Sequence, residues 1–114
     1  MIRHVLALAG ALVLAVPALA DDASVAAGKA VVEMYCADCH ATGPSGESRL
    51  AIAPLFRELY LRYNVADLSE ALVEGIVTAH PEMPEFEFDP EQAQAIVDYL
   101  KSLEPAGSAA TEEQ

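Results

Sequence analysis

The sequence is poor in basic residues and in cysteine, and it has no tryptophan. Of its 114 residues, 6 are Lys or Arg and 18 are Asp or Glu, so the formal net charge is −12. A nucleic-acid binder needs a basic face, so this charge excludes that class, and it also disfavours adhesion to anionic lipid. Two cysteines allow at most one internal disulfide, which excludes a disulfide-dense scaffold.

Long apolar runs are missing from the sequence except near its start. Residues 1–20 contain 16 apolar residues. Arg3 gives a positive start, an apolar run follows from Val5 to Val16, and Ala18-Leu19-Ala20 places small residues where a signal peptidase reads. The run is short against the roughly 20 residues of a spanning helix. The pattern therefore predicts a signal peptide at residues 1–20 that is cleaved after Ala20, export to the periplasm, and no stable membrane insertion afterwards.

The chain after cleavage is expected to form one small domain at residues 21–104, followed by a disordered tail at residues 105–114. It would keep 5 basic and 18 acidic residues, for a net charge of −13. A domain of this size buries a modest core and often needs a disulfide, a metal or a large cofactor to stabilise it. The tail is small and polar, EPAGSAATEEQ from Glu104 on.

Strand signals are also missing, because no stretch alternates apolar and polar residues over the length of a strand. Helical spacing of apolar residues instead predicts an all-α domain of three to five short helices with long irregular connections. Helices are expected at residues 24–39, from residue 54, at residues 67–79 and from residue 89. Asp22 or Ser24 should cap the first helix, and Asp89, followed by proline, should cap the last.

Cys36-Ala37-Asp38-Cys39-His40 is the most informative part of the chain. C-x-x-C-H is the attachment signature of a c-type haem. Two thiols three residues apart at a helix end lie on nearly the same side, so each can add to one vinyl group of the porphyrin. The adjacent histidine then lies under the ring, where its Nε2 can bind iron. We therefore predict one covalently attached haem c, with thioether bonds to Cys36 and Cys39 and His40 as an axial iron ligand.

Three other readings of the motif are weaker. A thioredoxin-like redox pair belongs to a βαβ context, and no strand precedes this one. A zinc site built from Cys36, Cys39 and His40 would have only His80 to complete it. A structural disulfide that closes so short a loop would contribute little stability.

From about Gly28 to Leu103, the sequence resembles the small class I cytochromes c. Gly28 lies eight residues before Cys36, where that family has a small residue at which the first and last helices cross. Ile96 and Tyr99 match the aliphatic and aromatic positions of its last helix. The resemblance implies a domain wrapped around the covalently bound haem.

The pair Pro54-Leu55 resembles the loop proline of the family, whose carbonyl accepts the Nδ1–H of the axial histidine. This bond would fix the orientation and tautomer of the His40 ring. Pro44 is the competing candidate for the same role.

The resemblance also implies a methionine as the sixth iron ligand. Met83, followed by Pro84, lies between the last two expected helices, where the family has its ligand. Met34 is tied to the attachment side of the haem and is expected to pack in the core. His80 is the competing ligand, and ligation by two histidines would lower the reduction potential.

Further side chains are candidates for contact with the haem. Tyr60 or Tyr63 could approach the ring, although packing on a helix face explains either one. An arginine could pair with a propionate, although a solvated surface charge is the simpler role for each. Phe86 and Phe88 are expected to pack on the haem or on the last helix. The arginines that remain after cleavage are Arg49, Arg57 and Arg62.

The leading functional prediction is a monomeric periplasmic electron carrier that is not an enzyme. Its redox partners would dock a basic face onto acidic residues near the ligand segment, unless these acids only keep the protein soluble. One alternative is a haem protein that binds or senses nitric oxide, carbon monoxide or peroxide at a labile sixth position. Another is a dedicated haem subunit of one dehydrogenase or oxidase. The acidic residues are Glu82, Glu85, Glu87 and Asp89.

Overall fold

The computed structural model describes residues 10–14, 21–77 and 81–108, and within these ranges the fold is helical. The described residues contain no strand, and a single antiparallel bridge joins Ile76 to Phe86. The all-α class expected from the sequence is therefore confirmed. The elements are α1 (Asp22–Tyr35), the 3-10 helices η1 (Phe56–Leu61) and η2 (Val65–Asp67), α2 (Leu68–Glu74) and α3 (Pro90–Ser102).

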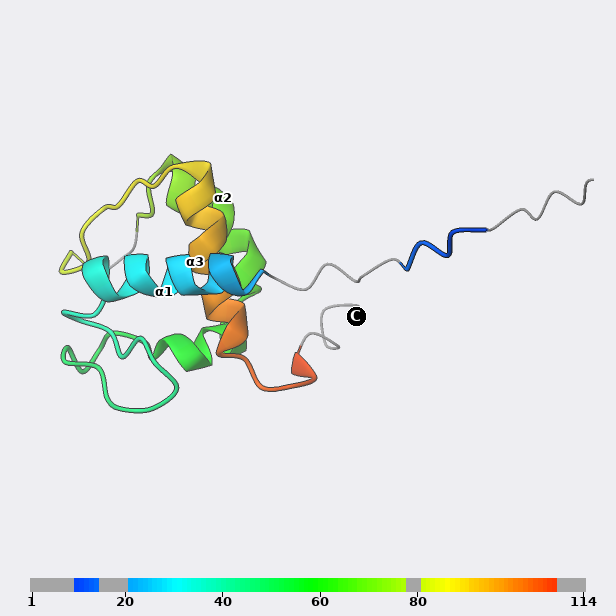
Figure 1. The fold of residues 1–114 in the computed structure, drawn as a ribbon. Helices are drawn as coiled ribbons and strands as arrows, with labels where there is room; N and C mark the ends of the chain where they lie inside the picture. Colours follow the sequence, from blue (N-terminus) through cyan, green and yellow to red (C-terminus); the bar gives the residue numbers. More distant parts are fainter. Residues whose placement is uncertain (1–9, 15–20, 78–80, 109–114) are drawn as a thin grey trace, which may run out of the picture.

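The first and last helices cross at Gly28, and the other elements are arranged around this crossing (Figure 1). A Cβ atom at Gly28 would clash with the backbone oxygen of Ala95 and would lie 2.9 Å from the Cβ of Tyr99. The two backbones therefore approach as closely as a glycine allows. The crossing expected at Gly28 is confirmed.

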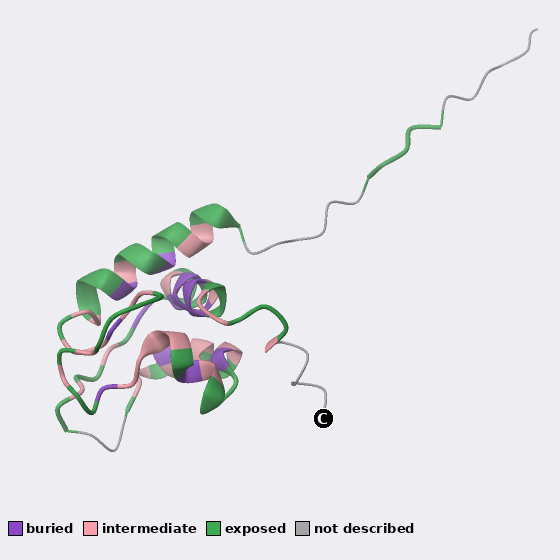
Figure 2. Ribbon diagram, turned by 90° about the horizontal axis from the view of Figure 1, so that it is seen from below, coloured by how far each residue is buried: buried purple, intermediate pink, exposed green. Residues whose placement is uncertain are grey.

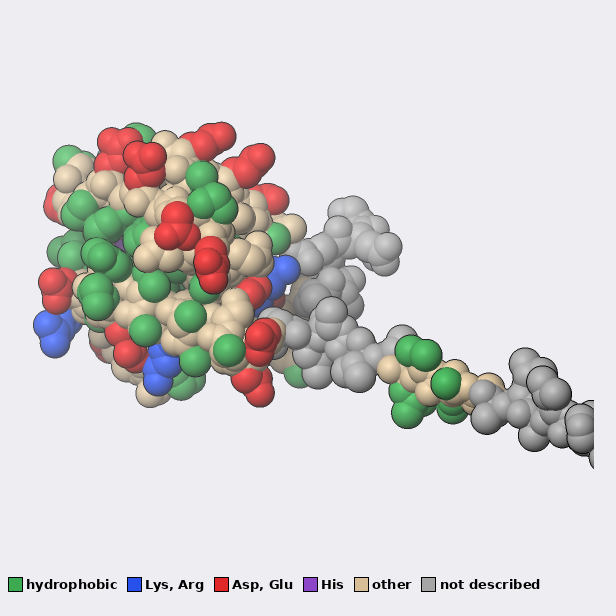
Figure 3. Space-filling model, turned by 45° about the horizontal axis from the view of Figure 1, so that its top comes forward, with side chains coloured by type: hydrophobic (Ala, Val, Ile, Leu, Met, Phe, Trp, Pro, Cys, Tyr) green, Lys and Arg blue, Asp and Glu red, His purple; other side chains and the backbone are tan. Residues whose placement is uncertain are grey.

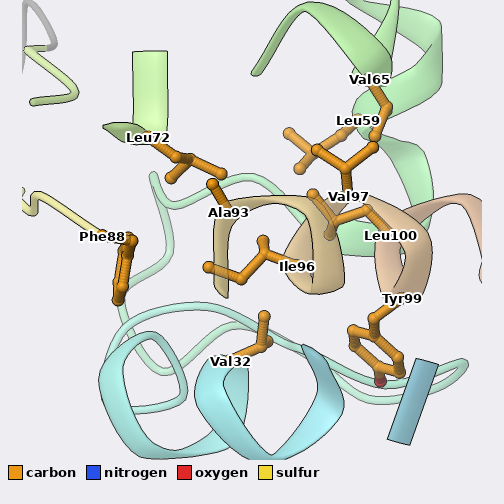
Figure 4. Close-up of a cluster of buried hydrophobic side chains, with 10 residues drawn as sticks. All are labelled: Val32, Leu59, Val65, Leu72, Phe88, Ala93, Ile96, Val97, Tyr99 and Leu100. Atoms are coloured by element: carbon orange, nitrogen blue, oxygen red, sulfur yellow. The ribbon is translucent and has the colours of Figure 1, made fainter. Parts of the chain in front are cut away.

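Helix α3 lies at the centre of the core, and its start was predicted correctly. The Asp89 carboxylate accepts a hydrogen bond of 2.8 Å from the Gln92 N–H, and Pro90 occupies the first turn. In Figure 4, α3 side chains face α1 on one side and α2 with the 3-10 helices on the other. The core consists of Val32, Leu59, Val65, Leu72, Phe88, Ala93, Ile96, Val97, Tyr99 and Leu100.

Helix α1 buries one side only, and its outer side is exposed (Figure 2). Gly28 and Val32 are its buried residues. The expectation that Met34 packs in the core is wrong, because its side chain is 73 % exposed. Met34 is two positions from both Val32 and Cys36, which places it on the opposite side of the helix at 100° per residue.

The bounds and cap of the first helix also differ from the prediction. The helix begins at Asp22, two residues earlier than expected, and is capped by Asp21, whose carboxylate accepts from the Ala23 N–H at 3.1 Å. Ser24 instead donates a 2.6 Å hydrogen bond to the Asp98 carboxylate of α3. The helix ends at Tyr35 rather than near Cys39, because the Cys36 carbonyl accepts from the N–H groups of both Cys39 and His40 in tight turns.

The helix expected at residues 67–79 is shorter than predicted. Asn64 caps a preceding turn of 3-10 helix by accepting from the Ala66 N–H, and α2 then ends at Glu74. Gly75 stops the helix with a φ of +103°, a conformation that residues with a side chain rarely adopt. Ile76 then donates its N–H to the Phe86 carbonyl, so the chain leaves the helix as an extended segment.

The predicted domain boundaries, after residue 20 and after residue 104, stay predictions. The larger part of the expected signal peptide, residues 1–9 and 15–20, lies outside the described residues, so its cleavage stays a prediction. Residues 105–108 of the expected tail form a turn, and residues 109–114 also lie outside the described part. No helix among the described residues is long and apolar enough to cross a membrane.

Replacing Gly28 by alanine should destabilise the protein by about 3 kcal/mol, because the new methyl group meets a backbone carbonyl that cannot move aside cheaply. Chemical denaturation of the haem-loaded protein measures this change. Gly43→Ala is the matched control, because a Cβ there has no heavy atom within 4 Å. A loss in Gly28→Ala as small as that of the control would contradict the close crossing.

Candidate functional site

A cavity of about 620 Å³ opens beside α3, and it brings together residues that are far apart in the sequence. This volume is within the range of small-molecule and cofactor sites. Most of the lining is apolar. The predicted site residues Cys36, Cys39, His40, Pro54 and Met83 all line it.

The His40 ring is held by a hydrogen bond at one nitrogen. Its Nδ1 lies 2.7 Å from the Pro54 carbonyl oxygen. A carbonyl can only accept, so Nδ1 must carry the hydrogen and the neutral ring then has its lone pair on Nε2. Nε2 is the nitrogen left free to bind a metal. Pro54 rather than Pro44 makes the contact, and Pro44 is exposed.

Phe56 packs against the same imidazole, a contact that the sequence analysis did not predict. The two ring centroids are 4.7 Å apart, with the planes tilted by 40°. Phe56 is itself fixed by its N–H, which donates to the Ala41 carbonyl at 3.0 Å. Residues 40–41 and 54–56 therefore support each other through two hydrogen bonds and one ring contact. The position of Phe56, two residues after Pro54, is the signal that could have revealed it.

The loop between His40 and Pro54 is tied down at several points. The buried Ala41 donates its N–H to the Ser48 hydroxyl at 3.0 Å. Arg57 donates to the Gly46 carbonyl at 2.8 Å. At its start, the loop is fastened to α3, because the Tyr99 hydroxyl donates to the Thr42 carbonyl at 2.6 Å. Burial raises the pKa of Tyr99, with a smaller contribution from Glu33, so this hydroxyl keeps its proton.

The two cysteines are free thiols and lie in the turns that follow α1. Burial, together with a smaller contribution from the charge of Cys39, raises the pKa of Cys36 to about 11. The Cys36 thiol is therefore protonated at neutral pH in the folded chain without haem.

Met83 lies in the segment that leads into α3, and this segment is anchored on both sides. Ile76 donates to the Phe86 carbonyl at 3.1 Å, and Phe88 donates to the Leu72 carbonyl at 2.8 Å. On its other side, the segment contacts Tyr35 of α1 through Phe86 and Phe88. His80, the competing ligand, lies outside the described residues.

The remaining candidates divide between the cavity and other positions. Tyr63 and Arg62 line the cavity, whereas Tyr60 packs against the core cluster. Of the expected arginines, Arg57 is engaged with Gly46. Phe86 and Phe88 line the cavity, and both contact Tyr35, which also lines it and was not predicted.

The cavity mouth combines apolar and acidic groups. Tyr35, Ile52 and Tyr63 line the cavity and are still about half exposed, at 46 %, 58 % and 48 %. Asp38 and Glu82 are exposed acidic residues in the lining. Figure 3 shows hydrophobic side chains gathered toward the left of the domain, with acidic side chains spread around them over the same face.

The fold and this site define a small all-α c-type cytochrome domain, of the class I type with one C-x-x-C-H segment. A model of the family described as cytochrome C oxidase, cbb3-type, subunit III matches residues 23–100. The match spans well over half of the chain, which therefore belongs to this family. Searches of curated proteins and of solved structures found no match.

Membership of this family implies a covalent haem c and a general role in haem-based electron transfer. The residues present fit such a group. Two free thiols, an imidazole with a free Nε2 and a methionine thioether all line one mostly apolar cavity. These are the donor types that c-type haem proteins use for attachment and for iron.

Phe56→Leu should lower the free energy of unfolding by about 1 kcal/mol, because it removes an aromatic contact with the His40 ring. Denaturation of the haem-loaded protein gives the loss, and NMR line widths of the imidazole report its increased motion. Leu61→Ala is the control, since Leu61 is an exposed residue of η1. If the imidazole lines of Phe56→Leu keep the widths and shifts of the unmodified protein, the Pro54 carbonyl is sufficient to orient His40 without Phe56.

Proposed function

We propose that this protein is a periplasmic electron carrier that transfers one electron at a time between redox proteins through a single haem c. Cys36 and Cys39 hold the haem by thioether bonds, and His40 and Met83 are its axial ligands. The observation that carries the proposal is that all four side chains line one apolar cavity. When bound, the haem supplies an iron that can gain or lose one electron.

Each residue of the site has a distinct role in this proposal. The Pro54 carbonyl holds the Nδ1–H of His40 and so directs Nε2 toward the iron. The soft, neutral thioether of Met83 favours the ferrous state and raises the reduction potential relative to a second histidine. With both positions taken by protein groups, no coordination site is left for a substrate, so the protein is a carrier rather than an enzyme.

The partners proposed are redox proteins with a basic docking face, because exposed carboxylates such as Asp38 and Glu82 lie at the cavity mouth. Opposite charges would steer transient docking, with an on-rate that falls as salt is added. We propose that the protein acts as a monomer and that it is exported with its signal peptide cleaved after Ala20.

The family match favours a second candidate function. Because the family is described by a subunit of a cytochrome oxidase, the protein could serve as the dedicated haem subunit of one oxidase. Copurification of the native protein with one oxidase at fixed stoichiometry would support this role. Recovery as a free monomer would support the soluble carrier.

The carrier proposal predicts that the reduced protein does not bind carbon monoxide. The dithionite-reduced protein should give a sharp low-spin c-type spectrum that does not change when the gas is added. Met83→Ala should lose this spectrum and bind carbon monoxide, because its sixth position is open. Met34→Ala is the matched methionine control and should behave like the unmodified protein, since Met34 is exposed.

Two outcomes would contradict the assignment. A prompt spectral shift in the unmodified protein would mean a labile sixth position and would favour a haem protein that binds small ligands. An unchanged spectrum in Met83→Ala would mean that another residue is the sixth ligand, and the corresponding His80 variant would then be measured.

Mass spectrometry of the exported protein tests its processing and its cofactor content. The mature chain should begin at Asp21 and should retain the mass of one haem after denaturation in acid. The double variant Cys36→Ser/Cys39→Ser should lose the haem under the same conditions. A chain that begins elsewhere, or that releases its haem in acid, would overturn the corresponding prediction.

A further inference from the structure

Tyr35 joins the end of α1 to the segment that carries Met83. Its ring centroid lies 6.0 Å from that of Phe86 and 5.5 Å from that of Phe88, with interplanar angles of 65° and 73°. Both contacts have the edge-to-face geometry that aromatic pairs prefer. Phe86 and Phe88 also stack on each other at 5.9 Å. These three residues form what is here called the aromatic cluster.

The position of Tyr35 is not explained by core packing. The side chain is 46 % exposed, and the core cluster of α1 is built on Val32. Tyr35 directly precedes Cys36, and both residues line the cavity together with Met83 and Phe86. The ring therefore lies between the haem-attachment motif and the segment of the proposed sixth ligand.

The aromatic cluster complements the backbone hydrogen bonds of the Met83 segment. Phe86 accepts from the Ile76 N–H, and Phe88 donates to the Leu72 carbonyl. Both bonds hold the segment to α2 and to the residue after Gly75. The ring contacts of Tyr35 hold the same two phenylalanines to α1. The segment is thereby fixed between two helices directly after Met83-Pro84.

We propose that Tyr35 is a positioning residue for Met83. Its ring holds Phe86 and Phe88 against the end of α1, and the short chain between Met83 and Phe86 passes this constraint to the thioether. The cluster thus keeps the Met83 segment closed and external ligands away from the iron. This inference rests on the proposed ligation by Met83 and adds the residue that keeps the Met83 segment closed.

The size of the effect follows from the two ring contacts. Each edge-to-face contact stabilises the closed position of the segment, and Tyr35→Ala removes two of these contacts. We expect the open form of the segment to become about tenfold more populated, which corresponds to about 1.4 kcal/mol. An external ligand that binds only the open form gains apparent affinity by the same factor.

Imidazole is the probe, because it coordinates ferric haem when the sixth position opens. It is titrated into the oxidised, haem-loaded protein and followed by absorbance. Tyr35→Ala should bind imidazole about tenfold more tightly than the unmodified protein. Tyr35→Phe should restore the original affinity, since the cluster needs the ring and not the hydroxyl.

Tyr63→Ala is the matched control. Tyr63 is exposed to a similar extent, at 48 %, and lines the same cavity. Its ring makes no aromatic contact with Phe86 or Phe88 in the described structure. An equal gain in affinity in Tyr63→Ala and Tyr35→Ala would mean that a wider entrance causes the effect, and it would overturn the proposal.

Amide hydrogen exchange gives a readout that does not depend on the iron. The N–H groups of Ile76 and Phe88 should exchange faster in Tyr35→Ala, because they close the segment onto α2. Amides in the middle of α3 should be unaffected. Unchanged exchange at Ile76 and Phe88 would show that Tyr35 does not hold the segment.

The inference and the proposed function fail in different ways. If the unmodified protein binds carbon monoxide promptly, the closed carrier is wrong, and hydrogen exchange still tests the aromatic cluster. If the unmodified protein is closed and Tyr35→Ala changes neither imidazole affinity nor exchange, Tyr35 has no positioning role and the carrier proposal stands.

Discussion

The contact between α1 and α3 at Gly28 is the constraint on which the rest of the fold depends. The Ala95 carbonyl occupies the space that a side chain at position 28 would need. Because of this close approach, Val32 and Ile96 pack in the same core cluster, and Ser24 donates a hydrogen bond to the Asp98 carboxylate. It also sets the direction in which α1 runs, and therefore where the cysteine motif that follows α1 lies in space.

The site depends on how the segments after each helix are fastened to this crossing. The loop from Ala41 to Pro54 closes on His40 through the Pro54 carbonyl and on α3 through Tyr99. The Met83 segment closes on α2 through Phe88 and on α1 through Tyr35. The cavity lies between two irregular segments whose positions are set by the helices. In a domain with a small core, these contacts with the helices hold the two irregular segments, and with them His40 and Met83, in place.

Local signals explain what the sequence could predict. Asp89-Pro90 begins α3 as expected, because capping and the missing proline N–H act within one turn. The end of α2 could not be predicted, because Gly75 continues the apolar stripe and stops the helix only by adopting a positive φ. Tyr35 was missed because it meets its partners only through tertiary folding, and Phe56 was missed although the expected Pro54–His40 contact brings it beside the imidazole. Met34 was misplaced although its phase relative to Val32 already indicated the surface.

One hydrogen bond described above bears on the order in which the chain becomes structured during synthesis. Tyr99 reaches Thr42 across 57 residues of sequence. Until α3 has been made, neither the start of the loop after His40 nor the face of α1 has its partner. Closing so long a loop is entropically unfavourable before the core forms. A growing chain therefore lacks the α1–α3 contact, and the core cluster against which Cys36 packs stays incomplete, until its last helix is available. The burial that raises the pKa of Cys36 is a property of the finished fold.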